Sequence, residues 1–401
     1  MSNVNLNQSQ SKHHSNPLVK KSISKNTSNT TIPYILQITS LSIQEPLTWA
    51  YSTDDLSDSI QIIKLNSQSE LTNYQTLTTH HKNGRINELK STDQKPNCLI
   101  AGFSENPILS IWDLRMNNSL PILELKGSSS DPFLSLDFSL DGNLLSASSG
   151  DENQPRIDLF DCRSNPIPLH TYTESHSDLI TSLAFHPTEH HKLLSASTDG
   201  LIVTYDVRLV DEEDAVIATG NVGASLARSR WSGDGRFVWT GTDMETVAVW
   251  DGEDLGLIQD FGDIRLGELE RPHSSWRDPT SYLIDSTNLP KHVDPIQSRF
   301  GYFSGSQSGE VSLIEPSNQS NVPWNLLASL TGGHTDIVRS AIVDERSGMI
   351  LTGGEDGNIC LWPNVFEQDV EMMDTTSEDK AQKTGPEVTS PTIKQVRYKP
   401  Y

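Results

Sequence analysis

Three residue types that together can carry out acyl transfer lie within one short stretch of the chain, as His176, Ser195 and Asp199. In a serine hydrolase, the serine attacks the substrate, the histidine takes its proton and the aspartate orients the histidine. Such a triad also needs an exposed nucleophile beside donors that stabilise the oxyanion. The same residue types recur towards the C-terminus, as His334, Thr352 and Asp356. A set that recurs is better explained by hydrogen bonds that satisfy buried polar groups between strands, so we interpret both sets as structural.

Other signatures of catalysis or of metal binding are missing from the sequence. It contains no G-x-x-x-x-G-K-[ST], G-x-S-x-G or G-x-G-x-x-G motif. The adjacent histidines 80–81 and 190–191 are poor chelators, because neighbouring side chains on a strand point to opposite faces. The cysteines, Cys98, Cys162 and Cys360, lie far apart, which suits a reducing compartment. The sequence therefore predicts no catalytic, cofactor-binding or metal-binding residues.

The elements that hold these polar residues are indicated by a repeat. An aromatic residue precedes an aspartate at Trp112-Asp113, Phe160-Asp161, Tyr205-Asp206 and Trp250-Asp251. Two further positions continue the pattern without the aspartate, at Ile314-Glu315 and at Trp362. The steps from residue 112 through 160, 205, 250, 314 and 362 are 48, 45, 45, 64 and 48 residues. A period of about 40–45 residues that ends in Trp-Asp is typical of the blades of a β-propeller.

The sequence around each repeat reads as short strands. From the second repeat on, each contains a strand, a turn with Gly, Asp or Asn, and a return strand, and helical periodicity is nearly absent. Counting Ile63 as the first closing position predicts an all-β fold with seven blades over residues 32–363. Residues 1–31 are predicted to be a disordered tail, and residues 364–401 an acidic, largely disordered one. Residues 33–38 could form an isolated outer strand, and the N-terminal strand is expected to pair into the last blade and close the ring.

These repeats resemble WD40 repeats over most of residues 33–362. The fourth and seventh repeats are the clearest, and they contain the two polar sets described above. The resemblance implies a hydrogen-bonded set made of a loop His, a Ser or Thr, a turn Asp and a Trp. The matching positions are His334, Thr352, Asp356 and Trp362, and, with Tyr205 in place of the Trp, His176, Ser195 and Asp199.

A narrower resemblance is to the WD repeat-containing protein 89 group and its fungal relatives. It rests on the order of six short segments: ESHSD at 174–178, FHP at 185–187, DEEDA at 211–215, WSG at 231–233, GGHTDIVRS at 332–340 and LTGGEDG at 351–357. That group has no well-defined biochemical activity to carry over. The resemblance therefore predicts a fold and a general role in binding.

The charge balance suggests what such a protein binds. The chain has 30 basic and 53 acidic residues, a net charge of -23. Such a surface should repel nucleic acid and anionic membranes and attract basic proteins, although acidity also serves solubility alone. No apolar run reaches about 18 residues, and no signal peptide is evident. We expect a protein of the nucleus and/or cytoplasm, for which Lys20, Lys21 and Lys25 could be either a weak import signal or a solvated tail.

Three groups of residues are candidates for partner binding. Arg115, Arg163 and Arg208 each follow a repeat-ending aspartate by two positions. This resembles the Trp-Asp-x-Arg signature of WD40 substrate receptors that dock on cullin-4 ubiquitin ligases, although a basic residue at this position is common in WD40 proteins generally. The second group is an acidic loop, which with the acidic tract at 367–379 could bind a basic client or simply be solvated: Asp211, Glu212, Glu213 and Asp214.

The third candidate, Trp276, lies in an insertion at about residues 265–297 and could be either an exposed anchor or a residue that pins the loop. Taken together, the sequence predicts a non-enzymatic scaffold without a cofactor, a monomer within a larger complex. Its expected partner is a basic nuclear or ribosomal protein, with no direct binding of nucleic acid or membranes. The alternative is a substrate receptor of a cullin-4-type ubiquitin ligase that binds the adaptor through its arginines.

Overall fold

The computed structural model describes residues 14–22, 32–41, 46–55, 59–80, 83–92, 95–116, 118–150, 154–163, 166–266, 270–290, 300–319 and 322–366. The chain divides into two units, residues 1–365 and 366–401, and only Phe366 of the second is described. The predicted acidic tail therefore lies almost wholly outside the described residues. In the described part of the first unit the secondary structure is β-strand, apart from the short helix α1 (Glu212–Ala215).

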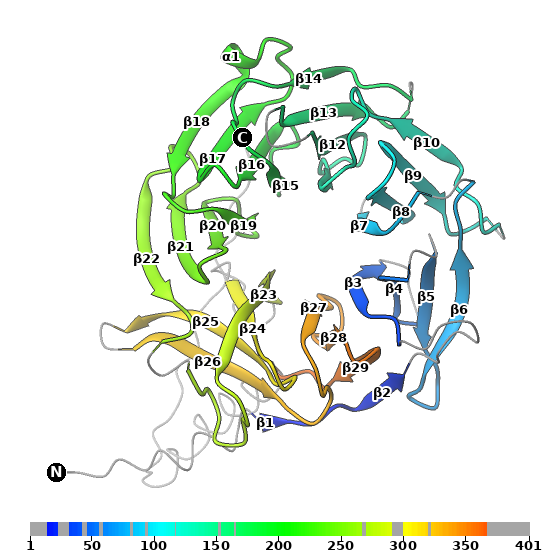
Figure 1. Cartoon of the computed structure of the whole chain (residues 1–401), viewed down its shortest axis with the longest axis vertical. Helices are drawn as coiled ribbons and strands as arrows, with labels where there is room; N and C mark the ends of the chain where they lie inside the picture. Colours follow the sequence, from blue (N-terminus) through cyan, green and yellow to red (C-terminus); the bar gives the residue numbers. More distant parts are fainter. Residues whose placement is uncertain are drawn as a thin grey trace, which may run out of the picture. The chain divides into compact units, whose positions relative to one another are not determined.

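Seven sheets follow one another around a ring (Figure 1). In blades 1 to 5 the first strand lies nearest the centre of the ring and the later strands lie progressively further out; in blades 6 and 7 the innermost strands are β23 (Thr280–Asn288) and β27 (Val338–Val343). This is a β-propeller. The all-β fold and the seven blades predicted from the repeat are confirmed.

The first four blades have four antiparallel strands each. Blade 1 contains β3 (Ile35–Leu41), β4 (Thr48–Thr53), β5 (Ile60–Leu65) and β6 (Leu71–Leu77). Blade 2 contains β7 (Ile86–Thr92), β8 (Lys95–Phe103), β9 (Ile108–Asp113) and β10 (Leu123–Lys126). Blade 3 contains β11 (Ser135–Phe138), β12 (Leu144–Ser149), β13 (Arg156–Asp161) and β14 (His170–Tyr172). Blade 4 contains β15 (Ile180–Phe185), β16 (Lys192–Ser197), β17 (Leu201–Asp206) and β18 (Val216–Asn221).

The last three blades include two strands from the N-terminal segment, β1 (His14–Ser15) and β2 (Val19–Ser22). Blade 5 contains β19 (Leu226–Trp231), β20 (Phe237–Thr242), β21 (Thr246–Asp251) and β22 (Leu257–Asp263). Blade 6 contains β23 (Thr280–Asn288), β24 (Phe300–Ser306), β25 (Val311–Gln319) and β26 (Val322–Leu330), with β1 outside β26. Blade 7 contains β27 (Val338–Val343), β28 (Ile350–Gly354) and β29 (Asn358–Trp362), with β2 as its outermost strand.

The hydrophobic core lies between neighbouring blades. The third strand of blades 2 to 5 is buried along its length except at its two ends, because another blade covers each of its faces. For example, Ile157 and Tyr172 of blade 3 share one cluster with Val203 and Tyr205 of blade 4. The rings of Tyr172 and Tyr205 stack with their centroids 5.2 Å apart. Each repeat therefore buries its apolar residues only when its neighbours are present.

The N-terminal segment differs from the prediction. Residues 1–31 were expected to be disordered, yet β2 pairs antiparallel with β29, from Val19 opposite Leu361 to Ser22 opposite Asn358. A segment of poor overall composition can still be ordered when its backbone completes the open edge of a sheet and one side chain, here Val19, packs on the core. The N-terminus therefore supplies the outer strand of the last blade.

The second difference concerns residues 33–38, which were expected to form an isolated outer strand. They lie within the loop before β3 and in β3 itself, the innermost strand of blade 1. Ile35 and Ile38 are buried in a cluster that blade 1 shares with Leu351 and Leu361 of blade 7. This burial explains the apolar character of the segment, because it forms the joint between the first and last blades.

Candidate functional site

The first candidate set joins a loop, two strands and a tight turn of blade 7. His334 Nδ1 lies 3.1 Å from Asp356 Oδ1, and its Nε2 lies 2.7 Å from Thr352 Oγ1. Trp362 Nε1 donates to the same hydroxyl at 2.8 Å. Gly357, the residue after the aspartate, has φ +69°, which lets the turn fold back towards the loop. The set therefore fastens the loop that enters the blade to the blade's own turn.

Blade 4 repeats this arrangement with a tyrosine in place of the tryptophan. His176 Nδ1 lies 3.0 Å from Asp199 Oδ2, and His176 Nε2 lies 2.6 Å from Ser195 Oγ. The hydroxyls of Ser195 and Tyr205 are 3.3 Å apart. Burial alone would raise the pKa of Asp199, but hydrogen bonds from His176 and from two backbone N–H groups outweigh it and lower the pKa. The carboxylate therefore stays ionised and holds the loop.

The hydrolase interpretation does not fit this geometry. Ser195 is fully buried, and His176 is buried beside it. The serine hydroxyl contacts His176 and Tyr205 inside the blade, so a substrate cannot approach it without opening the sheet. A nucleophile must be reachable by the reacting carbonyl. The arrangement can satisfy buried polar groups, and it is not suited to acyl transfer.

Two related sets of buried hydrogen bonds were not predicted from the sequence. In blade 5, Trp250 Nε1 donates to Thr240 Oγ1 at 3.0 Å, and the same hydroxyl donates to the Ala248 carbonyl. In blade 3 the fully buried Asp158 accepts hydrogen bonds from Ser128 and Thr171 instead. A spacing signal could have found the first pair, because Thr240 and Trp250 are separated by ten residues, as are Thr352 and Trp362. The Asp158 contacts follow no such spacing.

The three predicted arginines lie at one end of the ring, which we call the arginine end. They follow the third strands of blades 2, 3 and 4, and equivalent strands end on the same side because the blades repeat. Their side chains are 72%, 62% and 63% exposed for Arg115, Arg163 and Arg208. Each guanidinium forms two hydrogen bonds with the aspartate two positions earlier. Exposed, evenly spaced and locked in one orientation, they are suited to contact a protein surface.

Each of these Asp-x-Arg pairs also shapes its own turn. In the pair at Asp161, hydrogen bonds from the side chain and the backbone N–H of Arg163 lower the pKa of the aspartate to about 2. The same contacts lower the pKa of Asp113 and Asp206. A further pair, Asp263 and Arg265, follows β22 and was not singled out in the sequence. Because the pairing recurs outside the repeat-ending positions, it has a local structural role whatever binds there.

The acidic loop is less uniform than its sequence suggests. Asp211 caps helix α1 by accepting a hydrogen bond from the Asp214 backbone N–H. The Glu212 carboxylate accepts from three successive backbone N–H groups at residues 173–175, which ties it to the loop before β15. Asp211, Glu213 and Asp214 are exposed. Glu212 therefore fastens two loops together, and only the other three carboxylates face solvent.

Trp276 does not form an exposed anchor. Its side chain is only 3% exposed, and its Nε1 donates to Ser329 Oγ at 3.0 Å. The surrounding loop is held by Arg271, which donates to the carbonyl of Trp276, and by Arg277, which pairs with Glu310 at 3.0 Å. Of the two interpretations of Trp276, the structure favours the one in which it pins the insertion to blade 6. Burial of an indole beneath a long loop cannot be distinguished from exposure by sequence alone.

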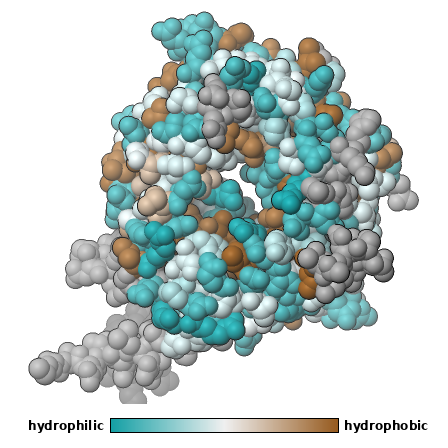
Figure 2. Space-filling view, viewed as in Figure 1, coloured by the Kyte–Doolittle hydropathy of each residue, from teal (hydrophilic) through white to brown (hydrophobic). Residues whose placement is uncertain are grey.

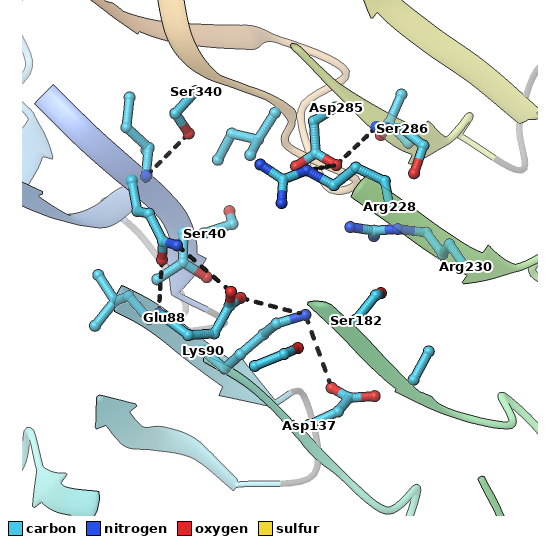
Figure 3. A pocket seen from close by; sticks show the side chains of 18 of the residues that line it. Ser40, Glu88, Lys90, Asp137, Ser182, Arg228, Arg230, Asp285, Ser286 and Ser340 are labelled. Atoms are coloured by element: carbon cyan, nitrogen blue, oxygen red, sulfur yellow. Dashed lines mark hydrogen bonds and ion pairs between the residues drawn. The ribbon is translucent and has the colours of Figure 1, made fainter. Parts of the chain in front are cut away.

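A central channel runs between the inner strands of the blades. Figure 2 shows its opening in the middle of the ring, and Figure 3 shows the side chains that line it. The cavity has a volume of about 630 Å³. Charged side chains from four inner strands point into it, a feature the sequence analysis did not single out: Glu88, Lys90, Asp137, Arg228, Arg230 and Asp285.

Comparison with known proteins agrees with this architecture. The family described as WD domain, G-beta repeat matches residues 167–206 and 324–363, which include the complete polar sets of blades 4 and 7. The chain therefore contains WD40 repeats, and its fold is a seven-bladed β-propeller.

Three relatives illustrate the narrower similarity. The chain is 26% identical to the WD repeat-containing protein 89 homolog of Dictyostelium discoideum over 314 residues, 76% of this chain and 77% of that protein. It is 28% identical over 289 residues to an uncharacterized WD repeat-containing protein of Saccharomyces cerevisiae, YNL035C, covering 70% and 68% of the two chains. It is 31% identical over 221 residues to the WD repeat-containing protein GTS1 of Arabidopsis thaliana, covering 51% of this chain and 52% of GTS1. The resemblance predicted from the sequence, to the WD repeat-containing protein 89 group and fungal relatives, is confirmed.

Within the described residues, no helix is long and apolar enough to cross a membrane. The same part of the chain holds no group of three or more His, Cys, Asp or Glu side chains placed to bind a metal ion.

Proposed function

We propose that this propeller is a non-enzymatic scaffold that binds a basic protein through acidic side chains at one end of its ring. WD40 propellers serve generally as platforms for protein partners, and the buried position of Ser195 supports a role without catalysis. The observation that carries the proposal concerns the end of the ring opposite the arginine end. We call it the histidine end, because the loops of His176 and His334 lie there.

At the histidine end, exposed carboxylates outnumber the exposed arginines that form no ion pair with a described residue, Arg85 and Arg271. Exposed acidic residues occur there in loops and turns all around the ring: Glu105, Glu174, Asp243, Glu270 and Asp336. Among the arginines of the same end, three are paired with carboxylates, namely Arg265, Arg277 and Arg339. Unpaired carboxylates spread over one end of a propeller attract a lysine- and arginine-rich chain and speed its encounter.

The test compares two acidic surfaces of the same protein. A triple variant at the histidine end, Glu105→Gln, Glu174→Gln and Asp336→Asn, removes three negative charges. A matched triple variant at the arginine end, Glu189→Gln, Glu253→Gln and Glu345→Gln, removes the same number from exposed positions. Both variants and the natural chain are titrated with a fluorescent lysine- and arginine-rich peptide at two salt concentrations.

We expect affinity to fall several-fold in the histidine-end variant, to change little in the arginine-end variant and to weaken with salt. Loss only in the arginine-end variant would move the binding surface to the arginine end. Equal binding by all three proteins would contradict a basic partner. Affinity capture with mass spectrometry at the same two salt concentrations then identifies the natural client.

The second candidate function is that of a substrate receptor for a cullin-4-type ubiquitin ligase. The observation in its favour is the row of exposed arginines on three successive blades, each held in place by an aspartate. Arg115→Ala with Arg163→Ala should abolish co-purification with the ligase adaptor while leaving the thermal unfolding temperature unchanged. Arg236→Ala is the matched control, because Arg236 also pairs with an aspartate two positions earlier but lies after a first strand. Retained co-purification in the double variant excludes this function.

A further inference from the structure

The channel contains two arginines that the rest of the protein leaves incompletely paired. Arg228 and Arg230 lie two positions apart on β19, so their side chains leave the strand on the same side. In Figure 3 both guanidinium groups project from β19 into the channel, towards the region of Lys90 on β7. Most other arginines of the described residues bind a carboxylate closely, as the Asp-x-Arg pairs do at 2.5–2.8 Å.

Two acidic residues of the channel, Glu88 and Asp137, have partners other than the two arginines. Lys90 Nζ lies between two carboxylates, 3.8 Å from Glu88 and 4.0 Å from Asp137. Asp137 also accepts a hydrogen bond from the Phe185 backbone N–H at 2.7 Å. The Arg228 Nε atom is 3.9 Å from Asp285, too far for a hydrogen bond. Arg230 has no carboxylate oxygen of a described residue within 4.0 Å and is influenced by Asp137 only through space.

Burial also affects the carboxyl groups of the channel wall. Burial raises the pKa of Glu88 and of Asp137, against the opposing effect of Lys90. The wall therefore loses negative charge more readily than a solvent-exposed pair of carboxylates. On the side of the channel formed by β19, two guanidinium groups therefore lack a closely bound carboxylate among the described residues, although the chain as a whole carries -23.

We propose that the central channel binds a small-molecule oxyanion, of the phosphate class, between Arg228 and Arg230. A guanidinium presents a planar fork of N–H donors that matches the oxygens of phosphate, and two such forks on one strand can hold one anion from adjacent directions. Lys90 lies across the channel, where Glu88 and Asp137 offset its charge. The volume of about 630 Å³ accommodates a small phosphate ester as well as inorganic phosphate.

The first experiment is a calorimetric titration of the purified full chain with inorganic phosphate, with chloride holding the ionic strength constant. We expect saturable binding with one site per chain. Arg230→Gln should weaken it about tenfold or more, since it removes a charge-assisted hydrogen-bonding group. Arg236→Gln changes the net charge equally on the exposed rim and should leave the affinity unchanged. No saturable binding by the natural chain, or an equal loss in both variants, would overturn the proposal.

A second variant protects the test against a failure of Arg230→Gln to fold. Glu88→Gln removes a negative charge from the channel wall and frees Lys90 of one partner, so it should tighten phosphate binding several-fold. Glu253→Gln removes a charge from an exposed position at the arginine end and should have no effect. An affinity that is unchanged or weaker in a folded Glu88→Gln protein contradicts an anion site in the channel.

A third titration distinguishes a small phosphate compound from a phosphorylated protein as the source of the anion. Inorganic phosphate, glycerol phosphate and a phosphoserine peptide are compared on the natural chain and on Arg230→Gln. Binding of the two small molecules that depends on Arg230 supports the proposal. Binding of the phosphopeptide alone would overturn it, because the channel would then recognise a modified protein.

Discussion

The indole nitrogen of Trp362 donates a hydrogen bond of 2.8 Å to the hydroxyl of Thr352, ten residues earlier in the chain. The same hydroxyl lies 2.7 Å from His334 Nε2, so it accepts from the indole and donates to the imidazole. His334 Nδ1 then donates to Asp356. A single buried hydroxyl therefore connects the third strand of blade 7 to the loop that enters the blade. The same spacing and contact occur at Thr240 and Trp250.

Replacing this hydroxyl should destabilise the propeller. Thr352→Val keeps the shape of the side chain but leaves the N–H of Trp362 and the Nε2 of His334 without a partner. Each unsatisfied buried group costs about 1–3 kcal/mol, so we expect the free energy of unfolding to fall by at least about 2 kcal/mol. Thr335→Val is the control, because Thr335 is exposed in the adjoining loop. Urea unfolding measures both, and equal stability in the two variants would show that the hydroxyl has no such role.

The same set predicts how stability depends on pH. Burial alone would raise the pKa of Asp356, but hydrogen bonds from His334 and Asn358 and the nearby imidazole outweigh it and leave the pKa well below the usual range. In the folded protein Asp356 therefore keeps its charge to lower pH than in the unfolded chain. Its contribution to stability is complete above about pH 4, the ordinary pKa of aspartate, and is lost as the pH falls towards the folded-state pKa.

Asp356→Asn isolates this contribution. The difference in unfolding free energy between the natural chain and the variant should be largest above pH 4 and shrink as the pH is lowered to 3 and below. Asp336→Asn, at an exposed position of the same loop, should give a small difference at every pH. A difference between natural chain and Asp356→Asn that stays constant with pH would exclude a stabilising ionised Asp356.

Trp276 offers a test of how the long insertion is held. Trp276→Phe removes the hydrogen bond to Ser329 Oγ and keeps most of the apolar contact, so it should cost about 1 kcal/mol. Trp276→Ala also leaves a cavity and should cost about 3–5 kcal/mol. Thermal unfolding of the two variants measures both steps. If Trp276→Ala were as stable as the natural chain, the side chain would have to be exposed in solution.

How far the sequence predicts this molecule depends on the kind of feature. The blades and the polar sets follow from residues that recur at a fixed spacing, such as Asp199-Gly200 and Asp356-Gly357, because the same local turn is required in each repeat. The repeat also predicts that Arg115, Arg163 and Arg208 lie on one end of the ring. Each of these inferences needs only local sequence and the knowledge that the copies are equivalent.

Features that depend on contacts between distant segments could not be predicted in the same way. Val19–Ser22 has no strand pattern of its own, and its order comes from the open edge of β29. The burial of Trp276 depends on Ser329, 53 residues away. The sequence around Arg228 and Arg230 alternates as in an ordinary strand. Only the closed ring shows that both arginines face a channel shared with Glu88 and Asp137.

The N-terminal segment should contribute stability out of proportion to its length, because β2 is the outer strand of the last blade. Deleting residues 1–22 removes β1 and β2, exposes the backbone edge of β29 and removes the contact of Lys21 Nζ with the Leu71 carbonyl, 3.1 Å long, that links β2 to blade 1. We expect unfolding free energy to fall by at least about 2 kcal/mol, from several backbone hydrogen bonds of about 0.5–1.5 kcal/mol each. An open edge also favours pairing with another chain, so the truncated protein should self-associate as its concentration rises.

Deleting residues 1–13 alone is the matched control, since it removes more than half of the same segment and leaves both strands in place. Thermal unfolding and sedimentation velocity should show this shorter deletion to be as stable and as monodisperse as the natural chain. A fall of equal size in both deletions would place the stabilising contacts before residue 14. If neither deletion altered stability or association, the ring would be held closed by the packing of Ile35 and Ile38 against blade 7 without any help from β2.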